Sequence, residues 1–314
     1  MSIDMPIEDA SVSQLQQVPI DRVMSIIDEG LVHLPSYREL YYRWERQQWM
    51  TQDIDFSTDR QQWQAMNEEE KRMRLGGLSA FFKGEECVTN TLAPYAVAMP
   101  TDEMRIFLTT QLVDEARHTV FFERFFTEAL GINYGHLEAT LGVVEKNMNP
   151  KTHYLLVDAL NDVSDRIRRN PSSMADLIEG VVLYHIIIEG TLALAGQRSI
   201  LEAYRQMNIF PAFRGGFTAV ARDESRHVVF GVKFLRDMIQ QDAANAHTVY
   251  AAVNKYAPTA IEGLTPIPEG IQMMLEQKMD PWQTPRYGAE SLRKKLKVIG
   301  ISMEIPSVPP PPTF

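Results

Sequence analysis

The sequence predicts an all-α protein, a four-helix bundle with additional flanking helices. Three observations lead to this fold class. Four long segments carry apolar residues at the spacing of a helix, and no segment shows a convincing strand pattern. Each segment is bounded by residues that begin or end helices. The links are short within two pairs of segments and long between the pairs, which is typical of a bundle with one crossover connection.

The N-terminal part of the chain precedes the bundle. Short helical pieces are expected over about 18–57, and they include Trp44 and Trp49. The first long helix is expected to follow Asn67, because this side chain suits an N-cap and three glutamates come directly after it. That helix is expected to end at Pro100.

The remaining long helices have similar boundary signals. The second is expected to follow Thr101 as its cap and to stop at Gly131. A polar segment over about 132–170 then forms the crossover. The third helix follows with Pro171 near its start, and the fourth begins at the sequence PAFRGG.

The C-terminal part completes a single domain. Shorter helices are expected over 243–300, and the domain is expected to cover residues 1–305 with its bundle core at about 67–242. Residues 306–314 are rich in proline, so they are predicted to form an extended, flexible tail.

Charge and cysteine content narrow the functional classes. The formal net charge is −10, which argues against nucleic acid as a partner, since phosphate binding requires a surplus of Lys and Arg. The single cysteine, Cys87, excludes an internal disulfide and favours a reducing, cytoplasmic location. The polar, acidic N-terminus does not resemble a signal peptide, and no uninterrupted apolar run predicts a transmembrane segment.

Two nearly identical pentads are the first functional signal. Asp114-Glu115-Ala116-Arg117-His118 lies in the second long helix, and Asp223-Glu224-Ser225-Arg226-His227 lies in the fourth. Residues three apart share a helix face, so each pentad presents a glutamate and a histidine together. A single copy would suggest an exposed charged face. Both copies, however, lie among apolar residues, where unpaired carboxylates are costly to bury.

Lone glutamates in the other two helices complete a pattern. Glu85 precedes Glu115 by one helix, and Glu189 precedes Glu224 by one helix, so antiparallel pairing brings each to a similar height. One glutamate from each of two helices and a Glu-x-x-His from each of the other two is the dinuclear carboxylate pattern of ferritin-like bundles. Two divalent cations would neutralise the four carboxylates, with both histidines neutral. The predicted ligands are Glu85, Glu115, His118, Glu189, Glu224 and His227.

The aspartates and one further histidine are candidates for the surrounding shell. Asp114 and Asp223 are expected to accept a hydrogen bond from a ligand histidine, or else to pair with Arg117 or Arg226. His185 lies four residues before Glu189 and can reach the metals, but it is expected to hydrogen-bond outside the ligand set or to lie beside the pocket.

Four segments give the chain a family resemblance. FFKGEECVTNTLAP, VDEARHTVFF, YHIIIEGTLALAG and RDESRHVVFG resemble the four metal-ligand helices of proteins related to the ribonucleotide reductase small subunit. Within that group the chain most resembles the ligand-binding oxidases, over roughly residues 35–245. The most specific marks are GEECV and YHIIIEG.

The resemblance implies a cofactor, a ligand and a cross-link. It implies a mixed manganese–iron centre, with two irons as the alternative that ligand types alone leave open. Glu85, Glu115 and His118 would hold manganese, with Glu115 bridging to iron. It also implies dioxygen as the oxidant and a long-chain fatty acid at the metals. Finally, it implies an ether bond between Val88 and Tyr184, two residues that would otherwise be ordinary core residues.

Two other functions remain as alternatives. A radical-generating small subunit of ribonucleotide reductase would share all six ligands. Its usual members carry a tyrosine four residues after the first metal histidine, where this chain has Phe122. The C-terminal segment also lacks the tyrosine expected in such a subunit. A ferritin-like ferroxidase or iron-binding protein is the second alternative. The external substrate and the electron donor are not predicted, and a homodimer is expected because it is common in such folds.

A basic segment near the C-terminus is a weaker candidate. SLRKKLKVIG at 291–300 is a short amphipathic stretch, which is expected to be a solvated helix face or a contact for anionic lipid.

Overall fold

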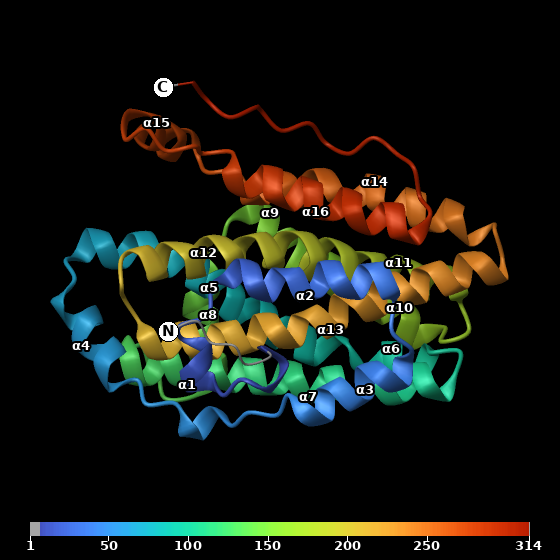
Figure 1. Ribbon diagram of the computed structural model, residues 1–314, viewed down its shortest axis with the longest axis horizontal. Coiled ribbons are helices and arrows are strands. Elements are labelled where there is room, and N and C mark those ends of the chain that lie inside the picture. Colours follow the sequence, from blue (N-terminus) through green and yellow to red (C-terminus); the bar gives the residue numbers. More distant parts are fainter. Residues whose placement is uncertain (1–6, 314) are drawn as a thin grey trace.

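A computed structural model describes residues 7–313 (Figure 1). Every regular element in that range is a helix, which confirms the predicted fold class. Residues 1–6 of the polar N-terminus and Phe314 of the tail lie outside the described residues.

The four predicted long helices are present and form the bundle, but the first ends at Thr91 rather than at Pro100, and a short separate helix with Pro94 in its first turn follows it. The first and second are α5 and α7, and the fourth is α13. The third is one continuous helix whose hydrogen-bonding pattern changes along its length: it is α-helical in its first part, π-helical in the middle and α-helical again at its end. The bounds are α5 Glu68–Thr91, α7 Asp102–Arg124, α11 Met174–Val181, η6 Val182–Ala193, α12 Leu194–Gln206 and α13 Pro211–Gln241.

Capping residues fix where the bundle helices begin. The Asn67 side chain accepts a hydrogen bond from the Glu70 backbone N–H, and Glu70 accepts one from Asn67 in return, as predicted for this cap. Thr101 caps α7 through the Met104 N–H. The α13 N-terminus has a cap that sequence spacing does not reveal. Asp59, buried in α4 (Ser57–Ala65), accepts from two amides of α13 across more than 150 residues.

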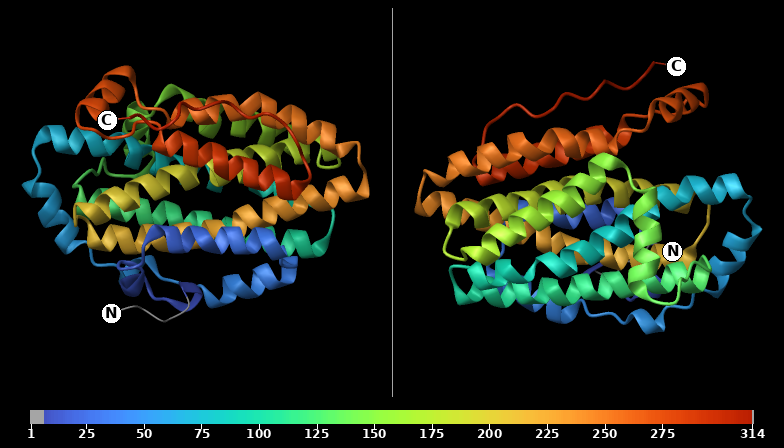
Figure 2. Two further views of the ribbon diagram at one scale, coloured as in Figure 1. Left: turned by 45° about the horizontal axis from the view of Figure 1, so that its top comes forward. Right: turned by 180° about the vertical axis from the view of Figure 1, so that it is seen from behind.

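The crossover segment has helical structure that was not predicted. The polar segment at 132–170 is largely helical and packs against the bundle, and Figure 2 shows it running across the back. Its overall polarity hides an apolar stripe, Leu156, Leu160, Val163 and Ile167, at helical spacing. All four are buried. Its elements are α8 Leu137–Val144, η4 Glu145–Asn147, α9 Pro150–His153, η5 Tyr154–Ala159 and α10 Leu160–Arg169.

Flanking helices cover the bundle on two sides. Near the N-terminus, α2 (Ile20–His33) packs against α13, and α3 (Tyr37–Arg46) packs against α7. At the other side α14 and α16 form a second layer on η6 (Figures 1 and 2). Smaller elements complete the chain. The remaining bounds are η1 Ile7–Asp9, α1 Val12–Leu15, η2 Thr51–Asp53, α6 Ala93–Ala98, η3 Phe125–Ala129, α14 Asn245–Leu264, α15 Pro268–Glu276 and α16 Gln283–Ile299.

The C-terminal tail is extended and runs back along α16 (Figure 1). Arg286 of α16 donates a hydrogen bond to the Pro309 carbonyl at 2.7 Å. Ile301, Met303 and Ile305 pack partly against the core. These contacts give the tail a defined path over the domain.

The third bundle helix is the most apolar element. Within the described residues, Met174–Gln206 is the one helix long and apolar enough to cross a membrane, yet 89% of its most apolar window is buried inside the protein. Its apolarity is therefore accounted for by the core of the bundle.

Candidate metal centre

The bundle brings all six predicted ligands together at its centre. Each is at most 7% exposed, although four of them are carboxylates. Glu85 comes from α5 and Glu189 from η6, while α7 and α13 each supply a glutamate and a histidine one turn apart. The set is Glu85, Glu115, His118, Glu189, Glu224 and His227.

The six side chains form two overlapping groups, each with its ligand atoms within 4.8 Å of one another. The first group holds Glu85 and His118, and the second holds Glu189 and His227. Glu115 and Glu224 belong to both groups. The family resemblance implies a shared role for Glu115. The equal position of Glu224 is found only in the structure.

Both histidines turn the same ring atom inward. Nδ1 of His118 lies 3.3 Å from a Glu85 oxygen and 3.4 Å from a Glu224 oxygen. Nδ1 of His227 lies 3.1 Å from Glu189 and 3.2 Å from the other Glu224 oxygen. Nδ1 is therefore the nitrogen available to a metal on each ring, and Nε2 points away from the four glutamates.

The electrostatics of the cluster suit cations. Burial raises the pKa of Glu85 and Glu189 well above the ordinary value. Burial alone would lower the pKa of His118 and His227, but the surrounding carboxylates raise it well above its ordinary value. Glu189 Oε2 is buried without a hydrogen-bond partner. An oxygen in that position needs a ligand, and two divalent cations would compensate the four carboxylates.

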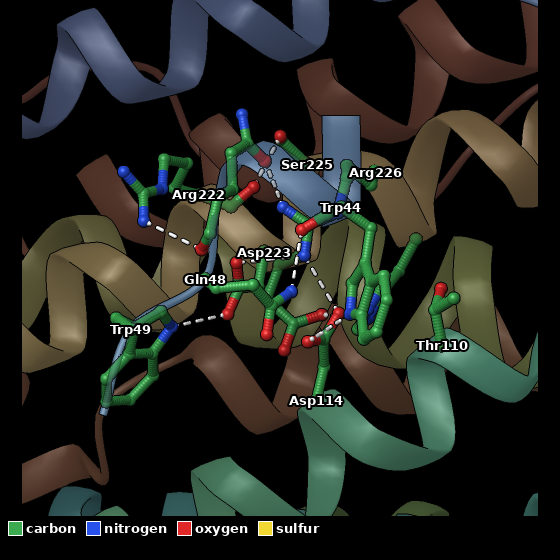
Figure 3. Close-up of polar contacts among 12 residues, drawn as sticks. Trp44, Gln48, Trp49, Thr110, Asp114, Arg222, Asp223, Ser225 and Arg226 are labelled. Carbon is green, nitrogen blue, oxygen red and sulfur yellow. Dashed lines mark hydrogen bonds and ion pairs between the residues drawn. The ribbon is translucent and has the colours of Figure 1, made fainter. Parts of the chain in front are cut away.

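The aspartates of the pentads orient the histidines, and they do so crosswise. Asp223 lies 3.3 Å from Nε2 of His118, and Asp114 lies 3.2 Å from Nε2 of His227. Each aspartate therefore serves the histidine of the other pentad. Arg226 donates to both aspartates, at 2.8 and 2.9 Å (Figure 3). The two roles weighed from sequence, histidine partner and arginine partner, occur together.

Two tryptophans from outside the bundle hydrogen-bond to these aspartates. The Trp49 indole N–H donates to Asp223 at 2.8 Å, and the Trp44 N–H donates to Asp114 at 3.0 Å (Figure 3). Sequence reasoning did not assign these contacts. The partners lie 174 and 70 residues apart, and no local spacing signals such a pair.

Tyr184 contacts the centre directly. Its hydroxyl donates to Glu115 at 2.7 Å, and its ring is fully buried. The tyrosine lies five residues before Glu189 inside the π-helix η6, where hydrogen bonds run from residue i to i+5, so residues five apart lie on one face. Val88, one turn after Glu85, lines the same cavity as Glu85 and Glu115.

His185 lies outside both ligand groups. Its Nε2 lies 3.2 Å from Gln111 Oε1, and Nδ1 has no hydrogen-bond partner. Burial lowers its pKa well below the ordinary value, so the ring is neutral. The ring packs 4.3 Å from that of Tyr184. The ring therefore lies beside the candidate ligands.

A cavity of about 360 Å³ leads from the ligand carboxylates toward the surface. Its wall is mainly apolar and includes Gly77 of α5 and Gly196 of α12. The lining also includes the half-buried residues Pro266 and Met274, the second of which belongs to α15. Among the described residues that line it, the charged ones are the four glutamates of the candidate ligand set.

Comparisons with known proteins agree with this geometry. The family model of the ribonucleotide reductase small chain matches residues 32–264. The chain is also similar to solved structures of variants of an R2-like ligand-binding oxidase. A valine-to-isoleucine and a glycine-to-leucine variant, both with an anaerobically reconstituted Mn/Fe cofactor, are 26% identical, with TM-scores of 0.72 and 0.73. A tyrosine-to-phenylalanine variant with aerobically reconstituted Mn/Fe is 25% identical, with a TM-score of 0.72. Each alignment covers 85% of this chain and 93% of the other.

Proposed function

The chain belongs to the ribonucleotide reductase small-chain family, and on that premise we propose that it is a dioxygen-dependent oxidase with a manganese–iron centre. The observation that carries the proposal is the buried six-ligand cluster at the inner end of an apolar cavity. A cofactor that activates dioxygen needs ligands of this kind and a site from which water is excluded.

Each of the two ligand groups would hold one metal ion. Manganese would lie with Glu85 and His118, and iron with Glu189 and His227, with Glu115 and Glu224 shared. The chemistry that the bound metals supply is the reduction of dioxygen and the two-electron oxidation of a C–H bond. Asp114 and Asp223 hold each histidine ring with Nδ1 inward, which fixes the ligand geometry before metal binds.

The first C–H bond oxidised is that of Val88. The Val88 Cβ–H and the Tyr184 O–H bonds break and a Cβ–O ether bond forms, while two protons and two electrons pass to dioxygen. Glu115 accepts the hydrogen bond of the Tyr184 hydroxyl and is placed to receive its proton. Burial, with the charge of Glu115, raises the pKa of Tyr184 well above its ordinary value, so the hydroxyl keeps its proton until it reacts.

The cavity suits a fatty acid or a similar single-chain amphiphile. Its apolar wall would bury the acyl chain, worth roughly 0.8 kcal/mol per CH₂. The lining holds no Lys or Arg side chain among the described residues, so an anionic head group is attracted only where metals neutralise the glutamates. Homodimeric assembly, a cytoplasmic location and an external electron donor belong to the same proposal.

A radical-generating subunit of ribonucleotide reductase is the second candidate, since the matching family model is that of the small chain. Phe122 argues against it. This ring is fully buried and packs against Phe82 and Phe217, so no phenol is present at the place where the usual members carry one.

Anaerobic loading with Mn(II) and Fe(II), followed by elemental analysis, tests the proposal. Two metal ions per chain and consumption of dioxygen on exposure to air are expected. A stoichiometry near zero would contradict the proposed centre. Support of nucleotide reduction by a large subunit from the same cell would favour the second candidate instead.

A further inference from the structure

One lysine of the basic segment 291–300 faces inward. Lys295 is 1% exposed, and no carboxylate pairs with it among the described ion pairs. Its neighbour Lys294 lies at the surface and forms an ion pair with Asp28 at 2.9 Å. A buried amine without a counterion is costly, so its position calls for a specific role.

Lys295 binds the helix that carries a metal ligand. Its Nζ donates to the Gly190 carbonyl at 2.7 Å, and Ser291, one turn earlier in α16, donates to the same carbonyl at 3.1 Å. Gly190 directly follows the ligand Glu189. Two side chains of α16 therefore converge on a single peptide group more than 100 residues away in the sequence.

The Gly190 carbonyl can accept side-chain hydrogen bonds because the backbone changes from π-helix to α-helix close to it. The Leu194 N–H bonds to the Glu189 carbonyl, five residues back, and the chain returns to α-helix from Leu194 onward. In the π-helix each N–H bonds to the carbonyl five residues earlier, and in the α-helix to the carbonyl four residues earlier. At the change between the two patterns one carbonyl receives no backbone N–H. After the bond from Leu194 to Glu189, that carbonyl is the one of Gly190. A buried carbonyl without a partner is unfavourable. Lys295 and Ser291 satisfy it.

The glycine and the lysine are complementary in shape. A Cβ atom at position 190 would lie 2.7 Å from Lys295 Cε and 2.8 Å from the His185 carbonyl oxygen. Any side chain at Gly190 would therefore displace the lysine stem or distort the π-helix. The contact depends on both residues.

We propose that Lys295, with Ser291, is a positioning residue that fixes the Glu189 carboxylate by holding the end of the π-helix η6. A π-helix of 12 residues is unusually long, and it depends on tertiary contacts because this geometry is rarely stable alone. We call the hydrogen bonds of Lys295 and Ser291 to the Gly190 carbonyl the clamp. Without the clamp, the segment could change to α-helix, which would rotate Glu189 relative to the other ligands. The inference depends on the proposed function, because Glu189 must be a metal ligand.

Lys295→Met tests the clamp, since methionine keeps an apolar stem against Gly190 but cannot donate. Lys294→Met in the same helix turn is the matched control. After anaerobic loading with Mn(II) alone, the wild type and the control should bind two ions per chain with an exchange-coupled electron paramagnetic resonance signal. Lys295→Met should retain one ion and bind the second about 10- to 100-fold more weakly, with the six-line signal of an isolated ion.

Hydrogen exchange of the metal-free protein gives a second, independent readout. Peptides that cover 186–194 should exchange faster in Lys295→Met than in the wild type or Lys294→Met. Ser291→Ala removes one of the two donors and should change both readouts in the same direction to a smaller extent, even if Lys295→Met does not fold. Unchanged exchange and unchanged affinity for the second metal would overturn the clamp. A wild-type chain without a second metal would instead overturn the proposed function.

Discussion

Asp223 hydrogen-bonds to Nε2 of His118, a histidine on a different helix, rather than to the histidine of its own pentad. Asp114 makes the mirror-image contact with His227. The two pentads are therefore interlocked across the bundle, and Arg226 joins their aspartates. Each helix thus positions a ligand that belongs to the other.

Asp223→Ala should weaken metal binding at the His118 group more than at the His227 group. The His118 ring loses the acceptor that orients it, and outer-shell changes of this kind typically cost 10- to 100-fold in metal affinity. Competition with a chelator, monitored by elemental analysis, measures the loss. Asp114→Ala is the matched variant and should weaken the His227 group instead. Equal losses at both groups in both variants would contradict the crossed arrangement.

Glu115→Ala should remove a ligand shared by both groups and the acceptor of the Tyr184 hydroxyl. We expect fewer than two metals per chain and no consumption of dioxygen by the reconstituted protein. An oxygen electrode and elemental analysis of the same sample provide the measurement. Glu103→Ala, at the exposed start of α7, is the control and should retain both properties. Normal turnover in Glu115→Ala would show that Glu115 is not a ligand.

Tyr184→Phe should retain the metals but never form the cross-link. In the wild type, loss of two hydrogens lowers the mass by about two daltons when metal and dioxygen are both present. Peptide mass spectrometry of samples loaded with Mn and Fe, with and without air, detects the joined peptides. If the peptides that contain Val88 and Tyr184 separate normally after aerobic loading of the wild type, the cross-link is excluded.

Gly196→Leu should block the cavity without affecting the metals. A Cβ atom at this position would already lie 3.1 Å from Phe81 Cζ, so a larger side chain occupies the passage. Long-chain fatty acid bound to the loaded protein should fall at least about tenfold, as steric exclusion from a pocket predicts. Mass spectrometry of extracted lipid measures it. Gly142→Leu, at an exposed site with no atom within 4 Å of the added Cβ, should bind the acid normally.

The stability of the metal-free protein should depend on Lys295 and pH. Burial lowers the pKa of Lys295 to about 7, from 10.5. Between these values the unfolded chain binds more protons than the folded chain, so the contribution of Lys295 to the free energy of unfolding increases as pH rises. Between pH 7 and pH 9, the free energy of unfolding of the wild type should rise by about 2 kcal/mol relative to that of Lys295→Met. Urea unfolding at each pH tests this, and a constant difference would show that the amine titrates normally.

Local physics explains which features of the fold the sequence predicts. The Asn67 and Thr101 caps involve partners three residues away, so they can be recognised from spacing alone. The helices of the crossover were not predicted, because a polar composition conceals the apolar stripe that includes Leu160 and Val163. The Asp59 cap on α13 has no local signal at all.

The sequence by itself determined the six candidate ligands. Three-residue spacing places the glutamate and the histidine of each pentad on one helix face wherever the helix lies. Glu85 and Glu189 stand out as lone glutamates in the other two apolar helices. Only the tertiary structure decided that Asp223 serves His118, that Glu224 is shared as Glu115 is, and that Trp44 and Trp49 reach the aspartates. It also decided that the Glu189 segment is π-helical and bound by Lys295. These features depend on how helices distant in sequence are rotated and packed against one another, and local periodicity does not specify that rotation.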